Sequence, residues 1–323
     1  MKAILVPQPG DPEVMQYRDT PDPVSGEDEL LVRVHAAALN RADLMQRRGG
    51  YAPPPGASPI LGLELAGEVV QAVPPWQVGD RVMAVVTGGA YAELVVVPAG
   101  IAMRIPDNLT YEQAAAIPEA FLTAYLNLFT LGKLQAGETV LIHAGASGVG
   151  TAGIQLARAA GARVIVTAGS EEKLAFCTEL GAEVAINYKQ ESFAQRVLDV
   201  TDQRGVNVIL DFVGAAYWNA NLQALALDGR LMLIGMMGGA AGQLEIDTIM
   251  AKRLTITGTT LRRTPMPQKI ELTQQFADFA LPRFERGELK AIVSAVYPLR
   301  EAATAHRLME SNQNIGKIVL KVD

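Results

Sequence analysis

The feature that most constrains the fold is an apolar run that leads directly into a glycine-rich turn, TVLIHAGASGVGT at residues 139–151. Residues 140–142 are apolar and partly β-branched, which is typical of a buried parallel strand, and residues 149–158 resume with helical spacing. A helix that begins after such a turn presents free backbone N–H groups and its positive dipole end to an anion. The segment therefore predicts a phosphate-binding turn. A glycine-rich turn without a ligand is the alternative.

This turn departs from the G-x-G-x-x-G pattern of dinucleotide-binding folds at its middle position. Gly145, Ser147 and Gly150 stand where that pattern has its three glycines, so a serine replaces the second one. Because one imperfect motif carries little weight, the choice between the two interpretations depends on the rest of the chain.

Length and charge narrow the class of protein. A chain of 323 residues predicts two domains, because single cores rarely grow past roughly 250–300 residues. The net charge of −6 and the scattered basic residues argue against nucleic acid as a partner. No segment approaches about 18 uninterrupted apolar residues, and the start of the chain lacks a signal-peptide core, so we expect a soluble, cytoplasmic protein without a membrane partner. The single cysteine, Cys177, excludes an internal disulfide and is expected to be a buried structural thiol.

Two kinds of pattern divide the chain. Residues 1–118 carry short strand patterns separated by proline-rich turns, which are typical of a small antiparallel barrel or sandwich. Residues 119–262 alternate strand and helix patterns with six candidate strands, which is the doubly wound nucleotide-binding plan. Residues 263–323 are too short for a domain, so we expect their strands to rejoin the N-terminal one. The predicted fold is α/β: a Rossmann doubly wound parallel sheet plus a β-rich domain formed by both chain ends.

The end of the second strand of the alternating region discriminates between cofactors. Folds that bind NAD place an Asp or Glu there, about 20 residues after the glycine turn, against the ribose 2′-hydroxyl. In VTAGS at residues 166–170 no carboxylate stands at the strand end, and Lys173 follows one helical turn later. An ammonium attracts a 2′-phosphate that a carboxylate would repel, so this segment predicts NADPH. Glu171 and Glu172 are expected to serve the helix dipole.

Segments spread over the whole chain resemble one enzyme family. They are ALNRADLMQRRGGYAPPPGAS, ILGLELAGEV, AAAIPEAFLTAY, HAGASGVG, VTAGSEEK, ALDGRLMLIGMMGG and NIGKIVL. Together they resemble the zinc-independent, zeta-crystallin-like quinone oxidoreductases of the medium-chain dehydrogenase/reductase superfamily, and among these the tumour-suppressor-inducible subgroup. The resemblance implies a GroES-like substrate domain, a Rossmann domain, NADPH and a homodimer. In the sequence itself, only the apolar region 254–260 hints at dimerisation.

The same resemblance assigns cofactor contacts residue by residue. It places the pyrophosphate at Ser147, Gly148, Val149 and Gly150, and the 2′-phosphate and ribose at Gly169, Ser170, Lys173 and Tyr188. Further contacts to the cofactor are implied at Thr123, Tyr125, Ile234, Gly235, Met236, Leu261, Asn314 and Lys317. Without the resemblance, Tyr188 is interpreted as a half-buried aromatic at a strand end. Lys317 is equally an ordinary charge before an edge strand.

Zinc ligands cannot be assembled from this sequence. Zinc alcohol dehydrogenases of the superfamily use a cysteine and a histidine where this chain has the segment 38–43, ALNRAD, and the segment 62–64, GLE. The only histidines are His35, His143 and His306, and they belong to separate patterns. Catalytic zinc needs three protein ligands and structural zinc four, so we expect no metal. Glu64 is expected to be a buried structural carboxylate with a partner.

Quinone reduction with NADPH requires orientation, polarisation of a carbonyl and exclusion of water. The candidate donors to a carbonyl oxygen are Asn40 and Tyr51, on the loop at residues 40–59. Asn40 is alternatively a helix cap, and Tyr51 a packing residue. Asp43 is expected to pair with Arg41 or Arg47, or to order the loop. The hypothesis is reduction of a small-molecule quinone without metal or flavin. An enoyl or alkenal double-bond reductase and a nucleotide-binding protein with little turnover stay open as alternatives.

Overall fold

The computed structural model describes residues 1–244 and 246–322. The chain divides into two compact units. Unit 1 comprises Met1–Leu122 and the C-terminal segment that begins at Leu261, and unit 2 comprises Thr123–Thr260. Among the described residues, no helix is both long and apolar enough to cross a membrane.

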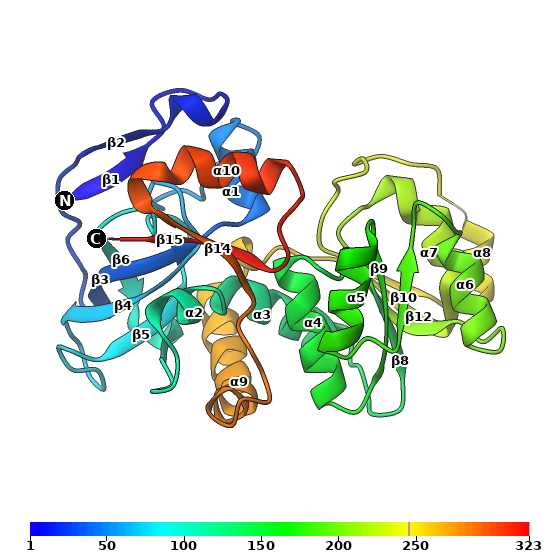
Figure 1. Ribbon diagram of the computed structural model, residues 1–323. Coiled ribbons are helices and arrows are strands. Elements are labelled where there is room, and N and C mark those ends of the chain that lie inside the picture. The colour runs from blue at the N-terminus through cyan, green and yellow to red at the C-terminus, as the bar shows by residue number, and fades with distance from the viewer. Residues whose placement is uncertain (245, 323) are drawn as a thin grey trace. The chain divides into compact units, whose positions relative to one another are not determined.

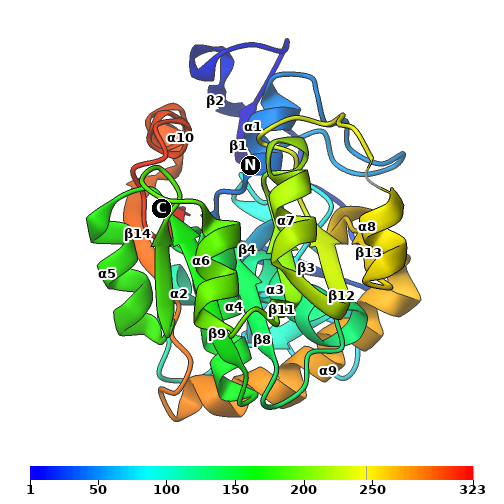
Figure 2. The same cartoon turned by 90° about the vertical axis from the view of Figure 1, so that its right-hand side faces the viewer.

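Unit 2 is built on a six-stranded parallel sheet with the strand order β10-β9-β8-β11-β12-β13, and Figure 2 shows β9, β8, β11 and β12 side by side. The strands are β8 Thr139–Ile142, β9 Arg163–Ala168, β10 Val184–Asn187, β11 Val206–Asp211, β12 Leu225–Leu233 and β13 Thr255–Gly258. The predicted doubly wound sheet is therefore confirmed. The strand order reverses between β8 and β11, and such a switch point is where open α/β sheets bind ligands.

Helices cover both faces of this sheet, with α4 and α5 on one side and α6 and α7 on the other (Figure 1). The core consists of fully buried strand residues such as Leu141, Ile165 and Ile209. Strand β12 begins at Leu225, and Asp228 and Gly229, which rarely occur in strands, interrupt its apolar pattern. The helices of this region are α3 Pro118–Tyr125, η3 Leu126–Leu131, α4 Gly148–Ala159, α5 Glu171–Leu180, α6 Phe193–Val200, η4 Ala215–Tyr217, α7 Trp218–Ala224 and α8 Ile246–Ala251.

Unit 1 contains a seven-stranded sheet in the order β14-β15-β3-β4-β5-β7, with β6 paired to β3 and a separate β1–β2 ribbon. Its strands are β1 Lys2–Leu5, β2 Gln16–Asp19, β3 Glu29–Ala38, β4 Glu64–Gln71, β5 Arg81–Val85, β6 Leu94–Pro98, β7 Ala102–Arg104, β14 Val293–Pro298 and β15 Lys317–Lys321. The C-terminal strand β15 pairs with the N-terminal strand β3 (Figure 1). This pairing confirms the prediction that both chain ends form the β-rich domain.

Two strands of unit 1 were not predicted, β2 and β7. The first is largely exposed and polar, and the second has only three residues, so neither shows a hydrophobic alternation. The helices of this unit are η1 Pro12–Val14, α1 Arg41–Arg47, η2 Ala99–Ile101, α2 Tyr111–Ala115, η5 Leu261–Arg263, α9 Met266–Glu285, η6 Leu299–Glu301 and α10 Ala302–Glu310.

Candidate active site

The turn after β8 is packed so closely that two of its glycines have no room for a side chain. A Cβ atom on Gly145 would lie 2.8 Å from the Cβ atom of Val166. One on Gly150 would lie 2.3 Å from the carbonyl oxygen of Ala144. The first and third glycines of the motif therefore let the β8–α4 turn approach β9 and close on itself.

The serine at the middle position caps helix α4. The hydroxyl of Ser147 accepts a hydrogen bond of 3.0 Å from the backbone N–H of Gly150. The N–H groups of Gly148 and Val149, at the first two helical positions, have no intrahelical acceptor because no residue precedes them in the helix. They are the donors that such a turn offers to an anion.

The end of β9 lies against an aromatic hydroxyl and a second lysine. A Cβ atom on Gly169 would lie 2.7 Å from the hydroxyl oxygen of Tyr188 and 3.1 Å from Cε of Lys189. Tyr188 follows β10 directly and is half-exposed. Sequence reasoning missed Lys189, although it stands next to Tyr188 in INYKQE. A basic residue beside a predicted phosphate contact was the available signal.

The start of α5 carries Ser170 as its cap, whose hydroxyl accepts from the N–H of Lys173 at 3.4 Å. Glu171 and Glu172 lie in the first turn of this helix, where carboxylates complement the dipole as predicted. One oxygen of Glu171 also accepts a 3.1 Å hydrogen bond from the amide of Asn187. Cys177 on the same helix is fully buried and free, and burial raises its pKa to about 12, so the predicted inert structural thiol is confirmed.

The remaining predicted contacts of unit 2 lie on α3 and after β12. The N–H groups of Ile234 and Gly235 donate to the carbonyl of Asp211 at 2.8 and 3.2 Å, so this loop continues from β12 along the end of β11. Met236 follows and is more than half exposed. On α3, the carbonyl of Thr123 accepts from the amide of Asn127 at 2.9 Å, and the ring of Tyr125 packs on Phe129.

A buried polar chain ties three strand ends of unit 2 together. His143 follows β8, and its ring nitrogens lie 3.0 Å from the hydroxyl of Thr167 and 2.8 Å from the amide oxygen of Asn221. The Asn221 amide donates in turn to the Asp211 carboxylate at 3.0 Å. Burial lowers the pKa of His143 to about 4, so this ring is neutral at physiological pH. Hydrogen bonds that link β9, β8 and β11 fix the edge on which the predicted cofactor contacts stand.

In unit 1, a buried cluster joins residues that are far apart in the sequence. The ammonium of Lys317 lies 2.6 Å from Glu64, 2.7 Å from the amide oxygen of Asn40 and 2.5 Å from the carbonyl of Leu39. The second oxygen of Glu64 accepts from the N–H of Glu119 at 2.8 Å. The prediction that Glu64 is a structural carboxylate with a partner is confirmed. The alternative for Lys317 is wrong, because β15 is an inner strand and its lysine is buried.

Asn40 directs its side chain into this cluster. Its amide nitrogen donates to Glu64 at 2.9 Å and more weakly to the carbonyl of Ala38 at 3.4 Å, so both N–H donors are engaged within unit 1. Helix α1 begins after Asn40, as the capping interpretation predicts. The backbone N–H of Asn40 donates a hydrogen bond of 2.8 Å to the Asp43 carboxylate.

Asp43 orders this loop instead of forming the ion pair that was predicted as an alternative. Its carboxylate accepts from the N–H of Gly62 at 3.1 Å and from the hydroxyl of Tyr91 at 3.2 Å. Burial raises its pKa to about 6. The expected pairing with Arg41 or Arg47 is wrong, because Arg47 pairs with Glu310, and no ion pair joins Arg41 to Asp43 in the described part of the chain.

Tyr51, the second candidate donor, lies beside Arg262. The guanidinium carbon of Arg262 stands 5.1 Å from the centre of the half-buried Tyr51 ring, and desolvation raises the pKa of the phenol. The predicted contact Leu261 is buried next to this arginine in the short helix η5. Asn314, in the loop before β15, donates to the carbonyl of Gly316 at 2.8 Å.

Sequence reasoning missed two charged residues near this part of unit 1. Glu119 lies in the first turn of α3, and burial, together with the nearby charge of Glu64, raises its pKa to about 8. Lys269, on α9, is 2% exposed. Charged residues on amphipathic helices are ordinarily solvated, so no sequence signal marked Lys269 as buried or Glu119 as half-buried.

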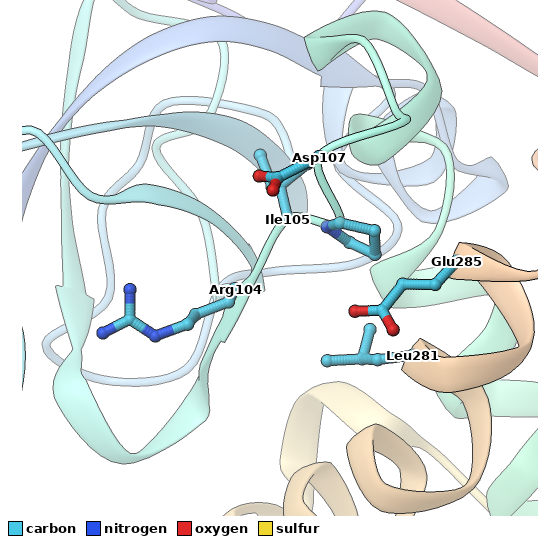
Figure 3. A pocket seen from close by; sticks show the side chains of 6 residues that line it. Arg104, Ile105, Asp107, Leu281 and Glu285 are labelled. Atoms are coloured by element: carbon cyan, nitrogen blue, oxygen red, sulfur yellow. The ribbon is translucent and has the colours of Figure 1, made fainter.

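Two cavities of unit 1 contain none of the predicted residues. The first, of about 240 Å³, is shown in Figure 3, where the Arg104 guanidinium points away from the two side chains of α9. It is lined by Arg104, Ile105, Pro106, Asp107, Leu281 and Glu285. The Arg104 guanidinium forms an ion pair with the Asp80 carboxylate at 3.0 Å. The second, of about 320 Å³, is lined by Arg33, Val34, His35, Glu93, Leu94 and Val322.

Comparison with known proteins places the chain in a family. Residues 26–107 match the alcohol dehydrogenase GroES-like domain, and residues 148–278 match the zinc-binding dehydrogenase family. Over 318 residues the chain is 37% identical to a quinone oxidoreductase of Pseudomonas aeruginosa, with 96% of each chain covered. The chain belongs to the quinone oxidoreductases of the medium-chain dehydrogenase/reductase superfamily. It is an oxidoreductase, and its β-rich unit is the GroES-like domain.

Two solved structures are similar to this chain over nearly their whole length. A mycobacterial protein in complex with NADPH is 33% identical, with 99% of both chains covered and a TM-score of 0.90. The JamJ enoyl reductase is 27% identical, with 100% of this chain and 99% of that chain covered and a TM-score of 0.89.

The zinc in the name of one matching family does not fit the residues of this chain. The described residues contain no group of three or more His, Cys, Asp or Glu side chains placed to hold a metal ion. Leu63 stands between Gly62 and Glu64, and His143 is engaged on both ring nitrogens. We derive no step through a metal.

Proposed function

We propose that this oxidoreductase reduces quinones with NADPH, without metal or flavin. The proposal of NADPH as cofactor rests on one edge of unit 2. There the N–H groups of Gly148 and Val149 at the start of α4 have no intrahelical acceptor, and Gly169 and Lys173 follow the end of β9. The quinone part is supported by relatives named quinone oxidoreductase that match nearly the whole chain.

The residues of unit 2 fit NADPH on chemical grounds. Gly148 and Val149 would donate to the pyrophosphate, while Ser170 and Lys173 would bind the 2′-phosphate. Of the two carboxylates in the first turn of α5, Glu171 accepts a hydrogen bond from the Asn187 amide. When bound, NADPH would supply a hydride, and the chain supplies its orientation.

Exchange of Lys173 for glutamate tests this cofactor preference. Reversal of the charge replaces a charge-assisted hydrogen bond of about 1.5–3 kcal/mol by repulsion, so the Kd of NADPH is expected to rise at least about 100-fold. The Kd of NADH, which lacks the 2′-phosphate, is expected to change by less than about 3-fold. Equal losses for both cofactors, measured by fluorescence titration, would refute the assignment.

Within unit 1, Tyr51 is the proposed donor to the quinone oxygen. Its hydroxyl has no hydrogen-bond partner in the described part of the chain, whereas both N–H donors of Asn40 are engaged. Asn40 and Lys317 then act as positioning residues for the loop that carries Tyr51. Tyr51→Phe is expected to lower kcat/KM for quinones about 10-fold, the effect of one lost hydrogen bond. The matched control is Tyr17→Phe, at an exposed position.

Steady-state oxidation of NADPH against a panel of quinones, alkenals and enoyl thioesters tests the reaction itself. We expect turnover of electron-poor quinones. Turnover of enoyl thioesters alone would favour the double-bond reductase that the JamJ structure represents. Tight NADPH binding without turnover of any acceptor would favour the binding protein.

We also propose that the protein is a homodimer that pairs at β13. This strand is the edge of the unit 2 sheet, and the neighbouring helix α8 exposes 58% of Ile246 and 72% of Met250. An open apolar edge is a template for pairing with a second chain. Light scattering of the wild-type protein is expected to give twice the mass of the chain. The double variant Ile246→Asp with Met250→Asp is expected to give the mass of the monomer.

A further inference from the structure

Two buried cations of unit 1 retain donors that the protein does not satisfy. Arg262 is 6% exposed, and its Nε and Nη2 atoms both donate to the carbonyl of Thr87, at 2.9 and 2.6 Å. Its Nη1 atom is buried and has no hydrogen-bond partner among the described residues. Lys269 is 2% exposed, and within the described ranges its ammonium has neither an ion pair nor a hydrogen bond, but its Nζ atom, unlike Nη1 of Arg262, is not fully buried.

The burial of these two cations lowers the stability of the protein unless an anionic ligand pairs with them. Lys and Arg are almost never fully buried without a partner, because removing a charge from water costs several kcal/mol. Burial lowers the pKa of Lys269, and the charge of Arg262 lowers it further, so the two cations lie within electrostatic range of each other. The start of α9, with its positive dipole end, adds to the positive potential around Lys269.

The carboxyl groups nearby do not neutralise this pair. Glu119 acts electrostatically on both cations, yet its own pKa of about 8 keeps it protonated at neutral pH. Asp43, with a pKa of about 6, is ionised at neutral pH and also acts on Arg262, but its single negative charge faces two cations. At neutral pH the Arg262–Lys269 pair therefore carries an excess of positive charge.

We propose that Nη1 of Arg262 and the ammonium of Lys269 bind an anionic group of the substrate, so that the preferred acceptors are acidic quinones. The Tyr51 ring packed on the guanidinium provides a flat apolar surface beside the free donor, which suits a planar aromatic ring bearing a carboxylate or similar oxyanion. This inference rests on the proposed function, which it makes specific for one class of quinone.

A matched pair of substrates tests the inference by kinetics. The probes are ortho-naphthoquinone and its ring sulfonate, which share the electrophile and differ in one negative charge. Lys269→Met and Arg262→Gln are each expected to lower the ratio of kcat/KM for the sulfonate to that for the neutral quinone about 10- to 100-fold, the effect of one lost charged hydrogen bond. Lys269→Arg is expected to restore the ratio. Arg263→Gln removes the same charge from an exposed neighbour and is expected to leave the ratio unchanged.

An equilibrium measurement separates this inference from the proposed reaction. Calorimetry with naphthalene sulfonate, which cannot be reduced, is expected to show binding to the wild-type protein and none to Lys269→Met. Binding without any quinone turnover would refute the proposed function and leave the anion site standing. No binding to the wild type, or a substrate ratio unchanged in Lys269→Met, would overturn the anion site.

Thermal stability gives a third, independent measurement. Lys269→Met removes a buried charge without a partner, so its Tm is expected to exceed that of the wild type in the absence of ligand. A purely structural lysine would give the opposite sign. Sulfonate is expected to raise the Tm of the wild type and not that of the variant.

Discussion

The two units present their polar groups by different physical means. In unit 2 the candidate site is made largely of backbone: the free N–H groups at the start of α4, and glycines whose missing side chains let chain segments touch. In unit 1 it is made of buried charged side chains, such as Glu64 and Lys317, that only the folded chain brings together. A backbone site depends on shape, whereas a side-chain cluster depends on each partner being present.

The largest expected effect concerns the buried ion pair of unit 1. Lys317→Met leaves the carboxylate of Glu64 without its cation at a position with no solvent exposure. Removing one partner of a buried pair costs about 3–5 kcal/mol, so the free energy of unfolding in urea is expected to fall by that amount.

The double variant Lys317→Met with Glu64→Gln is the control for this prediction. It removes the stranded charge and is expected to recover about half of the loss, because an amide retains one acceptor. A single variant that loses less than about 1 kcal/mol would show that the pair is solvated, as surface pairs are.

The second prediction concerns the β8–α4 turn of unit 2, where backbone groups form the candidate site. Gly150→Ala places a Cβ atom 2.3 Å from the carbonyl oxygen of Ala144, so the turn must shift. Overpacking of this kind costs about 1–3 kcal/mol. The Kd of NADPH is expected to rise about 100-fold, since two N–H donors move with the turn. Gly242→Ala is the matched control, because a Cβ atom there would meet no atom closer than 3.6 Å, and it is expected to change neither quantity.

This difference between backbone and side chains also explains what could be predicted from the sequence. The glycine turn, the strand before it and the helix after it are contiguous, so spacing alone predicted this strand–turn–helix unit and the sheet around it. The resemblance supplied Tyr188 and Lys317, whose contacts come from other strands. Neither argument found Lys189, although its neighbour had been named.

The charged cluster of unit 1 could not be predicted in the same way. Glu119 and Lys269 lie on helices whose patterns give no sign that these positions are covered, and the groups around them come from β4, β15 and η5. For Asp43, the sequence offered Arg41 and Arg47 as near neighbours, whereas the folded chain brings Gly62 and Tyr91. Contacts that form only in the tertiary structure cannot be predicted from the local sequence pattern.

A third prediction uses pH to test whether the Glu119 carboxyl is protonated in the folded protein. The pKa of Glu119 is about 8 in the folded protein, above its ordinary 4.5, because of burial and the charges of Glu64 and Asp43, and despite Lys317 and Lys269. The folded state therefore favours the protonated form. The contribution of Glu119 to stability is full below pH 4.5, declines as the pH rises and is lost once the pH passes about 8.

Glu119→Gln imitates the protonated carboxyl at every pH and so isolates this contribution. Between pH 5 and 8 the Tm of the wild type is expected to fall relative to that of the variant by several degrees, since each kcal/mol moves Tm by about 2–4 °C. Above pH 8 the difference is expected to level off. Parallel curves across the whole range would mean that the carboxyl ionises as it does in water.

The smallest effect is expected at Ser147, the one position where the turn departs from three glycines. Its hydroxyl satisfies the N–H of Gly150 and caps α4. Loss of a cap costs about 1 kcal/mol in Ser147→Ala and only a few tenths in Ser147→Gly. If the site is made of backbone, NADPH affinity stays within about 3-fold in both variants, because the N–H groups of Gly148 and Val149 remain in place. A loss beyond 10-fold in Ser147→Gly, with stability retained, would instead make the serine hydroxyl a direct ligand of the pyrophosphate. The backbone site of unit 2 would then depend on a side chain, as the cluster of unit 1 does.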